Sequence, residues 1–305
     1  MKRDFLTIAD FTSQEIRDTL NLAVSVKAQT QQGRCPNILN GRTGALIFHK
    51  PSLRTRASFE VGFRELGGSA VYITDKEISL GKRESIHDVA KVMSRYFAVI
   101  CIRTFSHKDV EELARHASVP VVNMLTDRFH PCQLMSDMLT IFEHKGTIDD
   151  LTITYLGDGN NMAHSWIRMA SRIPMTLRIG TARETAPDED ILSAARATGV
   201  SRIEVVHDAA SAVTNADVVY TDVWASMGEK DKATERAAML NPFQVNQTLL
   251  AGADKAAIVL HCLPAERGKE ITDEVMDGPQ SVVFDQAENR LHAQKAILMK
   301  LLETR

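Results

Sequence analysis

The sequence predicts an α/β protein made of two doubly wound domains, each built on a parallel sheet. Two observations support this prediction: short apolar runs of strand length alternate with amphipathic stretches of helix length, and the alternation occurs in two successive series. This alternation is typical of a parallel sheet whose two faces are covered by helices, because the buried strands are apolar throughout and the helices are apolar on one face. With 305 residues, the chain is long enough for two domains of ordinary size with substantial cores.

The first series begins with an apolar run at residues 44–48, which we expect to be a buried strand. Residues 58–66 follow as a helix that ends at Gly67 and Gly68, since helices commonly end at glycine. Further strands are expected at residues 70–73, 99–102 and 120–123, and helices around residues 85–97 and 109–117. Together these elements form the first predicted domain, residues 1–145.

The second series supplies five expected strands, at residues 151–156, 176–180, 217–220, 257–261 and near 282–285. A helix ends at residues 143–146, where Gly146 suits a helix C-cap, so the domain boundary falls near residues 143–150. The second predicted domain is residues 146–288. The last stretch, residues 289–305, has apolar side chains at helical spacing and must pack against another part of the chain.

Composition excludes several classes of function. Hydrophobic residues make up 44% of the chain and charged residues 25%, and the formal net charge is -3, so we expect no binding of nucleic acid and no attraction to an anionic membrane. No window approaches the roughly 20 consecutive apolar residues of a membrane span, and the first residues lack the apolar core of a signal peptide. We therefore expect a cytoplasmic protein.

The cysteines do not indicate a disulfide framework or a zinc ribbon, because the four of them lack paired spacing. Two neighbouring pairs, His130 with Cys132 and His261 with Cys262, offer metal ligands. Neither has the matching second pair that structural zinc usually needs. We expect no metal and no cofactor.

An anion site is predicted where Ser52-Leu53-Arg54-Thr55-Arg56 follows the strand at residues 44–48. Open α/β sheets bind ligands at the carboxyl ends of their strands. Backbone N–H groups at a helix start are unpaired, and the helix dipole favours negative charge there. In isolation, the segment would be better explained by Ser52 capping a helix while Arg54 and Arg56 lie in solvent.

Other polar residues favour the anion site over a simple cap. Arg103 ends the strand at residues 99–102, and His130 and Gln133 follow the strand at residues 120–123 after a short loop. These side chains would face the same crevice as the helix that starts at Ser52. Together they make a set of donors for a phosphate group and an adjoining carbonyl.

The loop Gly157-Asp158-Gly159-Asn160-Asn161 is a weak candidate for nucleotide binding. It follows an expected strand, but it lacks the third glycine of a dinucleotide-binding loop and an acidic residue at the expected distance. We prefer a contact from Asn161 to a small ligand.

With these residues in place, the chain resembles the aspartate/ornithine carbamoyltransferase family over nearly its whole length. The Ser-x-Arg-Thr-Arg and His-Pro-x-Gln segments are similar to the family's carbamoyl-phosphate site. Three later segments resemble the ornithine branch: residues 222–228, residues 284–294, and His261-Cys262-Leu263-Pro264, where aspartate-specific relatives usually have His-Pro-Leu-Pro.

The resemblance implies two sets of binding residues. Those around carbamoyl phosphate are Ser52, Leu53, Arg54, Thr55, Ser79, Arg103, His130, Gln133, Cys262, Leu263 and Arg290. Those around ornithine are Asn161, Asp222, Ser226 and Met227. It also implies that the last helix packs back on the first domain, which binds carbamoyl phosphate while the second binds ornithine.

The chain departs from the family pattern at two positions. Leu53 stands where ornithine members commonly have Thr, although its backbone N–H remains for the anion cradle. Ser79-Leu80-Gly81-Lys82 stands where a glutamine before Leu-Gly is frequent. In the family, this loop reaches the neighbouring subunit's site, so the resemblance implies a homotrimer, or an assembly of trimers, with sites shared between subunits.

The implied reaction is attack by the δ-amine of ornithine on the carbonyl of carbamoyl phosphate, giving citrulline and phosphate. Thr55, Arg103 and His130 are the candidates for stabilising the developing oxyanion. Cys262, beside Asp222 in the family, is the candidate to receive or orient the amine's proton. We expect the reaction to serve arginine metabolism, and biosynthesis in particular.

Two alternatives remain from the sequence. One is a carbamoyltransferase for another amine, such as putrescine, N-acetylornithine or N-succinylornithine; Asp222 and the segment Ser226-Met227-Gly228 favour free ornithine. The other is an inactive binding or regulatory protein on the same fold, which the complete donor set disfavours.

Overall fold

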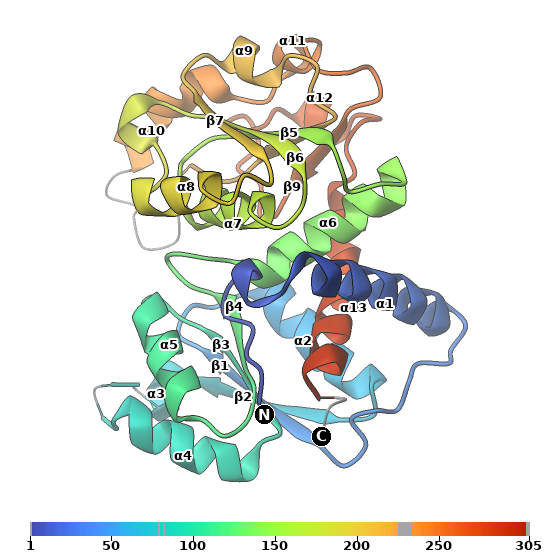
Figure 1. Ribbon diagram of the computed structural model, residues 1–305, viewed down its shortest axis with the longest axis vertical. Helices are drawn as coiled ribbons and strands as arrows, with labels where there is room; N and C mark the ends of the chain where they lie inside the picture. Colours follow the sequence, from blue (N-terminus) through green and yellow to red (C-terminus); the bar gives the residue numbers. More distant parts are fainter. Residues whose placement is uncertain (1, 79, 82, 225–232, 303–305) are drawn as a thin grey trace. The chain divides into compact units, whose positions relative to one another are not determined.

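The computed structural model describes residues 2–78, 80–81, 83–224 and 233–302. The chain divides into two compact units, one formed by Met1–Leu139 with Glu288–Arg305 and the other by Thr140–Ala287 (Figure 1). Each unit has its own parallel sheet, of four strands in the first and five in the second. The predicted fold class is confirmed.

The first sheet has the strand order β2-β1-β3-β4, formed by β1 (Thr43–Phe48), β2 (Ser69–Thr74), β3 (Val99–Arg103) and β4 (Val121–Leu125). The chain runs from β1 to β2 on one side of β1 and then back past β1 to β3 and β4 on the other side, so the strand order reverses there. The carboxyl ends of β1 and β3 therefore flank a topological switch point, which is where open α/β sheets bind ligands. Phe48 and Arg103, the last residues of these two strands, are paired in register.

Helices cover both faces of this sheet. One face packs against α4 (Ile86–Tyr96) and α5 (His107–His116), whose buried side chains meet Ile100 and Ile102 of β3. The other face receives α2 (Leu53–Glu65), which lies so close that a Cβ at Gly44 would overlap the ring of Phe63. Gly44 thus lets α2 rest directly on β1. The remaining helical segments of this unit are η1 (Ile8–Asp10), α1 (Ser13–Gln31) and α3 (Asp75–Ile78).

The final helix, α13 (Val283–Leu302), packs against the first unit from Glu288 onward, as predicted (Figure 1). Lys27 Nζ of α1 donates to Asn289 Oδ1 at 2.8 Å, and Lys295 Nζ contacts Glu65 Oε2 of α2 at 2.6 Å. Arg42 Nη1 donates to the carbonyl of Leu302 at 3.0 Å. The apolar side chains on one face of α13 are buried, as expected for a helix that packs against the rest of the chain.

The second sheet has the strand order β7-β6-β5-β8-β9. Its strands are β5 (Leu151–Leu156), β6 (Met175–Gly180), β7 (Arg202–Val206), β8 (Val218–Thr221) and β9 (Ile258–His261). The order reverses between β5 and β8, so the second switch point lies at their carboxyl ends. Residues 157–161 follow β5 there, and Asp222 follows β8.

Helices also cover both faces of the second sheet. Trp166 of α7 (Asn161–Ala170) packs edge-on against Tyr220 of β8. The opposite face packs against side chains that include Ala212 of α9 (Ala209–Val213) and Val275 of α12 (Asp273–Met276). The chain passes from the first unit to the second within α6 (Pro131–Lys145). The remaining helical segments of the second unit are η2 (Arg183–Thr185), α8 (Glu189–Arg196), α10 (Ala233–Leu240), η4 (Asn241–Phe243) and α11 (Gln247–Leu250).

Two predicted elements need correction, and one strand was not predicted. Residues 282–285 are not a strand: Val283 begins α13, and β9 receives a single isolated bridge from Ser281 instead. The strand β7 was missed, because it lies at the sheet edge and only Ile203 among its residues is buried. The helix expected at residues 58–66 begins at Leu53, since Ser52 caps it.

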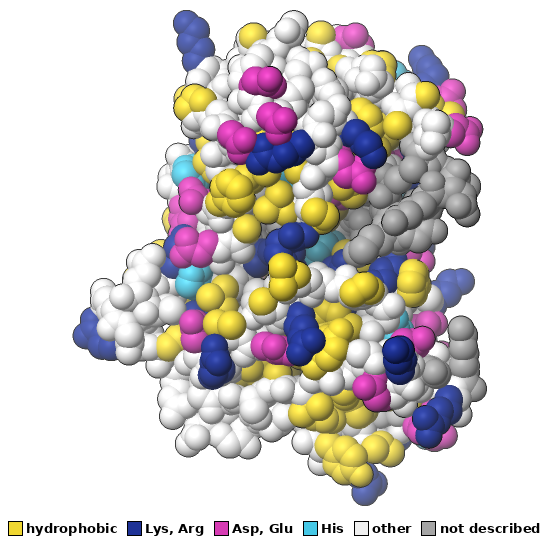
Figure 2. Space-filling view, turned by 180° about the vertical axis from the view of Figure 1, so that it is seen from behind, with side chains coloured by type: hydrophobic (Ala, Val, Ile, Leu, Met, Phe, Trp, Pro, Cys, Tyr) yellow, Lys and Arg dark blue, Asp and Glu magenta, His cyan; other side chains and the backbone are white. Residues whose placement is uncertain are grey.

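No helix in the described part of the chain is long and apolar enough to cross a membrane. On the face that Figure 2 shows, basic and acidic side chains are interspersed. This distribution agrees with the small net charge of -3.

Candidate active site

The start of α2 forms a polar cradle at the switch point of the first sheet. Ser52 is the N-cap: its Oγ accepts the N–H of Thr55 at 3.3 Å and contacts Thr55 Oγ1 at 3.0 Å. Leu53, the first residue of α2, is 80% exposed. Helix N-termini with these features bind anions.

Two buried guanidinium groups meet at the hydroxyl of Thr55. Arg290 Nη2 donates to Thr55 Oγ1 at 2.6 Å, and Arg103 Nη1 donates to the same oxygen at 3.4 Å. Thr55 is fully buried, and both arginines are less than a tenth exposed. Two positive charges concentrated in a buried place, beside a helix N-terminus, favour an anionic ligand.

His130 shares this positive environment. Burial, and then the charges of Arg290 and Arg103, lower the pKa of His130 well below its ordinary value of 6.5. The imidazole is therefore neutral near pH 7, and a neutral ring carries one N–H donor. A neutral donor of this kind is suited to a carbonyl oxygen.

Gln133 lies on the first turn of α6, next to His130. Its Nε2 donates to Asp137 Oδ1 at 2.8 Å, so the amide is oriented by a carboxylate one turn further along the helix. Its Oε1 is buried and has no hydrogen-bond partner among the described residues. An amide oxygen held in this way is suited to accept from the NH₂ of a ligand. Asp137 was not singled out from the sequence, although its i+4 spacing to Gln133 could have indicated it.

Arg54 lies beside Thr55 on the first turn of α2 and is half-buried. Its Nε is a buried donor for which the described residues offer no acceptor. Ser79 of the predicted carbamoyl-phosphate set, and Lys82 near it, lie outside the described residues. Cys262 and Leu263 of the same set belong to the second unit.

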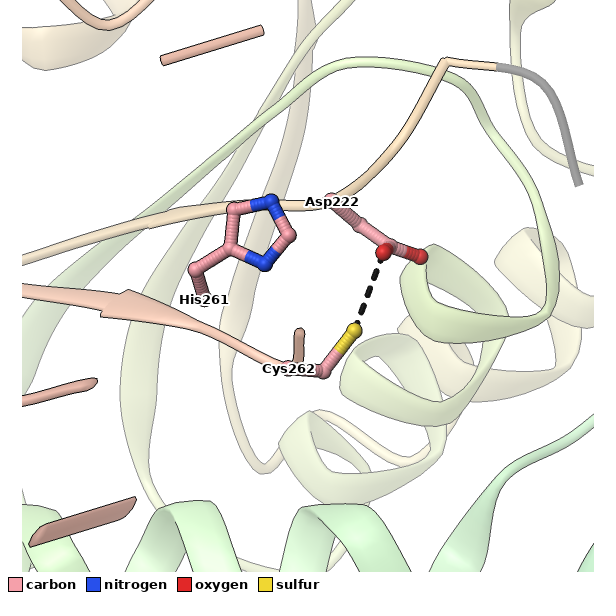
Figure 3. A group of neighbouring side chains, drawn as sticks. All are labelled: Asp222, His261 and Cys262. Carbon is pink, nitrogen blue, oxygen red and sulfur yellow. Dashed lines mark hydrogen bonds between the residues drawn. The ribbon is translucent and has the colours of Figure 1, made fainter. Parts of the chain in front are cut away.

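In the second unit, Asp222 lies at the centre of a polar group at the carboxyl ends of β8 and β9 (Figure 3). Cys262 Sγ donates to Asp222 Oδ1 at 2.9 Å, and the N–H of Val223 donates to the same oxygen at 2.8 Å. Asn160 Nδ2 contacts Asp222 Oδ2 at 3.4 Å. Thr221 and His261 pair in register, so Asp222 and Cys262 each follow directly after a paired strand.

Asn160 connects this group to α7. Its Oδ1 caps the helix by accepting the N–H of Met162 at 2.8 Å, and it also accepts from the hydroxyl of Tyr155 at 3.2 Å. Burial, followed by the charge of Asp222, raises the pKa of Tyr155 well above its ordinary value, so this hydroxyl stays protonated. The sequence prediction named Asn161, which is buried at the first position of α7, and missed Asn160. Ser226 and Met227 lie outside the described residues.

The backbone of the loop at residues 157–161 makes a close approach that explains one glycine. A Cβ at Gly159 would overlap the backbone of residues 185–187, and the N–H of Gly159 donates to the carbonyl of Thr185 at 2.8 Å. The loop therefore packs tightly against the backbone of residues 185–187. This gives Gly159 a structural role independent of nucleotide binding.

The side chains of Asp222, His261 and Cys262 offer three potential metal ligands within 4.8 Å of one another (Figure 3). Both ring nitrogens of His261 are already engaged, however, with Nε2 3.0 Å from Glu270 Oε1 and Nδ1 2.9 Å from the N–H of Leu263. The arrangement is therefore a hydrogen-bonded network, in which the thiol of Cys262 donates to the carboxylate of Asp222.

Two family models match the chain. Residues 3–143 match the carbamoyl-P binding domain of aspartate/ornithine carbamoyltransferase, and residues 149–301 match its Asp/Orn binding domain. A curated protein named ornithine carbamoyltransferase, from Syntrophus aciditrophicus, is 48% identical over 302 residues, covering 99% of this chain and all of that protein. The chloroplastic ornithine carbamoyltransferase of Pisum sativum is also 48% identical, over 98% of this chain and 80% of its own length.

Solved structures agree with these matches. The ornithine carbamoyltransferase from Pyrococcus furiosus superposes with a TM-score of 0.95 at 45% identity, covering all of this chain and 98% of that chain. The anabolic ornithine carbamoyltransferase from Campylobacter jejuni gives a TM-score of 0.94 at 32% identity over the full length of both chains. The chain belongs to the aspartate/ornithine carbamoyltransferase family.

Proposed function

We propose that this protein is an ornithine carbamoyltransferase, an enzyme that transfers the carbamoyl group of carbamoyl phosphate to the δ-amine of L-ornithine and releases citrulline and phosphate. The observation that carries the proposal is that two buried guanidinium groups, those of Arg103 and Arg290, both donate to the hydroxyl of Thr55. The name shared by the full-length relatives supports the choice of ornithine.

In this proposal, the first unit binds carbamoyl phosphate. Ser52, Arg54, Arg103 and the N-terminus of α2 hold the phosphate, where negative charge increases as it departs. Thr55, Arg103 and the neutral His130 donate to the carbonyl oxygen, which becomes an oxyanion in the transition state. Gln133 Oε1 accepts from the carbamoyl NH₂, since Asp137 occupies its amide nitrogen.

The second unit binds ornithine. Asp222 pairs with the α-ammonium group, with Asn161, Ser226 and Met227 as the further contacts. Cys262 orients the δ-amine or receives its proton, because its thiol already shares a hydrogen bond with Asp222. The amine must be neutral to attack, and the departing phosphate can also accept a proton.

The test of this function is citrulline formation from carbamoyl phosphate with L-ornithine, measured beside aspartate, putrescine, N-acetylornithine and N-succinylornithine at equal concentration. We expect strong preference for ornithine. Preference for another amine would retain the carbamoyl-phosphate assignments and reject the role of Asp222. A folded Arg54→Ala variant should lose several orders of magnitude in rate, and near-normal activity would reject the phosphate assignment of Arg54.

We also propose that the enzyme is a homotrimer that works in the cytoplasm in arginine biosynthesis. Light scattering should then give a mass of about 101 kDa, three times 33.8 kDa. If the loop around Ser79 serves a neighbouring subunit, mixing an inactive Arg103→Ala variant with an inactive variant of residues 79–82 should restore activity in hybrid trimers. A monomeric mass, or no recovery on mixing, would reject the trimer or the shared site respectively.

A further inference from the structure

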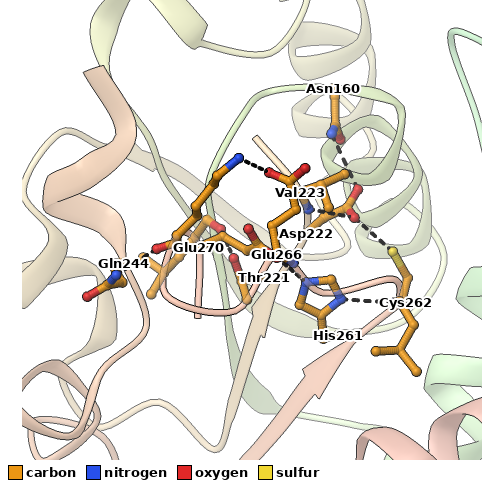
Figure 4. Close-up of polar contacts among 12 residues, drawn as sticks. Asn160, Thr221, Asp222, Val223, Gln244, His261, Cys262, Glu266 and Glu270 are labelled. Carbon is orange, nitrogen blue, oxygen red and sulfur yellow. Dashed lines mark hydrogen bonds and ion pairs between the residues drawn. The ribbon is translucent and has the colours of Figure 1, made fainter. Parts of the chain in front are cut away.

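Glu270 and His261 form a fully buried pair whose role is not accounted for by the binding sets above (Figure 4). His261 ends β9, and Glu270 lies further along the segment that follows it. The two side chains contact through His261 Nε2 and Glu270 Oε1 at 3.0 Å, with neither side chain exposed to solvent. A polar pair buried to this extent must satisfy its own hydrogen bonds.

The backbone assigns the tautomer of His261. The N–H of Leu263 donates to Nδ1 at 2.9 Å, so Nδ1 must present a lone pair. The ring proton is therefore on Nε2, where it is donated to Glu270. Glu270 thus stabilises the one tautomer that can hold the Leu263 N–H.

Leu263 needs this support because its φ is 56°, in the left-handed region that a leucine rarely adopts. Glu270 Oε1 also accepts the N–H of Glu266, so a single carboxylate oxygen contacts both ends of the turn at residues 261–266. At the start of the turn, the N–H of His261 donates to Gln286 Oε1 at 2.8 Å.

Cys262 lies between His261 and Leu263, which these hydrogen bonds hold in place. Its thiol reaches Asp222 Oδ1 at 2.9 Å (Figure 4). The backbone conformation of residues 261–263 sets the direction in which this side chain leaves the chain. We propose that Glu270 is a positioning residue: through His261, it fixes the Cys262–Leu263 backbone from which the thiol reaches Asp222. This inference rests on the proposed role of Cys262 toward the ornithine amine.

The test compares two substitutions at one position. Glu270→Met removes the acceptor but keeps an unbranched side chain of similar size, whereas Glu270→Gln keeps an oxygen that accepts from both His261 and Glu266. We expect Glu270→Met to lower kcat/KM for ornithine about 10–100-fold, as loss of an orienting partner typically does, with KM for carbamoyl phosphate nearly unchanged. Glu270→Gln should restore activity to within about threefold of the parent protein.

A second substitution tests whether Glu270 acts through His261. The amide of His261→Asn can accept the N–H of Leu263 but cannot reach Glu270, so Glu270→Met in that background should cause little further loss in kcat/KM. A full additional loss would overturn the proposal. So would normal kcat/KM in folded Glu270→Met, or equal loss in Glu270→Gln and Glu270→Met.

A readout without substrate separates this inference from the proposed function. The rate at which iodoacetamide alkylates Cys262, measured by peptide mass spectrometry, reports the environment of the thiol without any substrate. Cys35, which is also partly exposed, is the internal reference because it lies in the other unit. We expect Glu270→Met to change the rate at Cys262 several-fold while Cys35 stays constant, and an unchanged rate at Cys262 would contradict the positioning role. A parent protein that alkylates as expected but makes no citrulline would reject the proposed function alone.

Discussion

Arg290 Nη2 and Thr55 Oγ1 form a 2.6 Å hydrogen bond between residues that are 235 positions apart in the sequence. The contact joins the final helix to the first turn of α2, at the point where the strand order of the first sheet reverses. Packing of α13 is therefore part of the site itself, because it delivers a second guanidinium to the hydroxyl that Arg103 also contacts.

Arg290→Lys should lower kcat about 10²–10³-fold while the protein stays folded, since an ammonium keeps the charge but cannot reproduce the geometry of the guanidinium donors. Steady-state kinetics and a thermal melt check this. Arg42→Lys is the matched control, because Arg42 also contacts α13, at the carbonyl of Leu302. If both variants lost activity equally, docking of the helix rather than Arg290 itself would be responsible.

His130 should make the protein less stable in acid. Its pKa in the folded state is lowered below the ordinary 6.5, so between these two pKa values the unfolded chain binds more protons than the folded one. The free energy of unfolding therefore falls as pH decreases below about 6.5, by at most about 1.4 kcal/mol per pH unit from this group. His107, whose pKa burial also lowers, contributes in the same direction.

Urea unfolding from pH 5 to pH 8 measures this effect. His130→Gln keeps an N–H donor and cannot take up the proton, so its stability should depend less steeply on pH below 6.5 than that of the parent protein. Equal slopes would mean that His130 is not held neutral by its surroundings.

Most strands could be predicted because parallel strands buried on both faces are continuous apolar runs. The two errors follow from the same rule. The edge strand β7 alternates Arg202, Ile203 and Glu204, and so lacks such a run. Val282 and Val283 form a short apolar pair that is buried at the start of a helix, which sequence alone does not distinguish from a strand.

Only part of the candidate site could be predicted from the sequence. Ser52, Thr55 and Arg103 could be grouped by physical argument, since each follows or ends a strand at the switch point. The spacing of residues in the sequence could not predict that Arg290 lies beside Thr55, and only the family resemblance indicated Arg290 as a residue of the site. Asn160 and Glu270 were missed because their roles depend on hydrogen bonds that only the folded turns create.

Glu65 should matter more to stability than its surface position suggests, because it contacts the fully buried Lys295 Nζ at 2.6 Å. Glu65→Leu leaves a buried ammonium with Thr30 Oγ1 and Cys35 Sγ as its contacts, and should cost about 3 kcal/mol of unfolding free energy. Lys295→Met should cost less, since the remaining Glu65 carboxylate is 27% exposed and can be hydrated. Urea unfolding of both variants would contradict this if Lys295→Met were the more damaging.

Asn160 has two functions that substitution can separate. Its Oδ1 caps α7, and its Nδ2 contacts Asp222. Asn160→Ala should lose about 1 kcal/mol of stability and also raise KM for ornithine. Asn160→Ser is the matched control, because serine caps helices about as well as asparagine but is too short to reach Asp222. We expect Asn160→Ser to melt near the parent temperature with the raised KM retained, whereas a normal KM in this variant would show that the contact with Asp222 does not orient it for substrate.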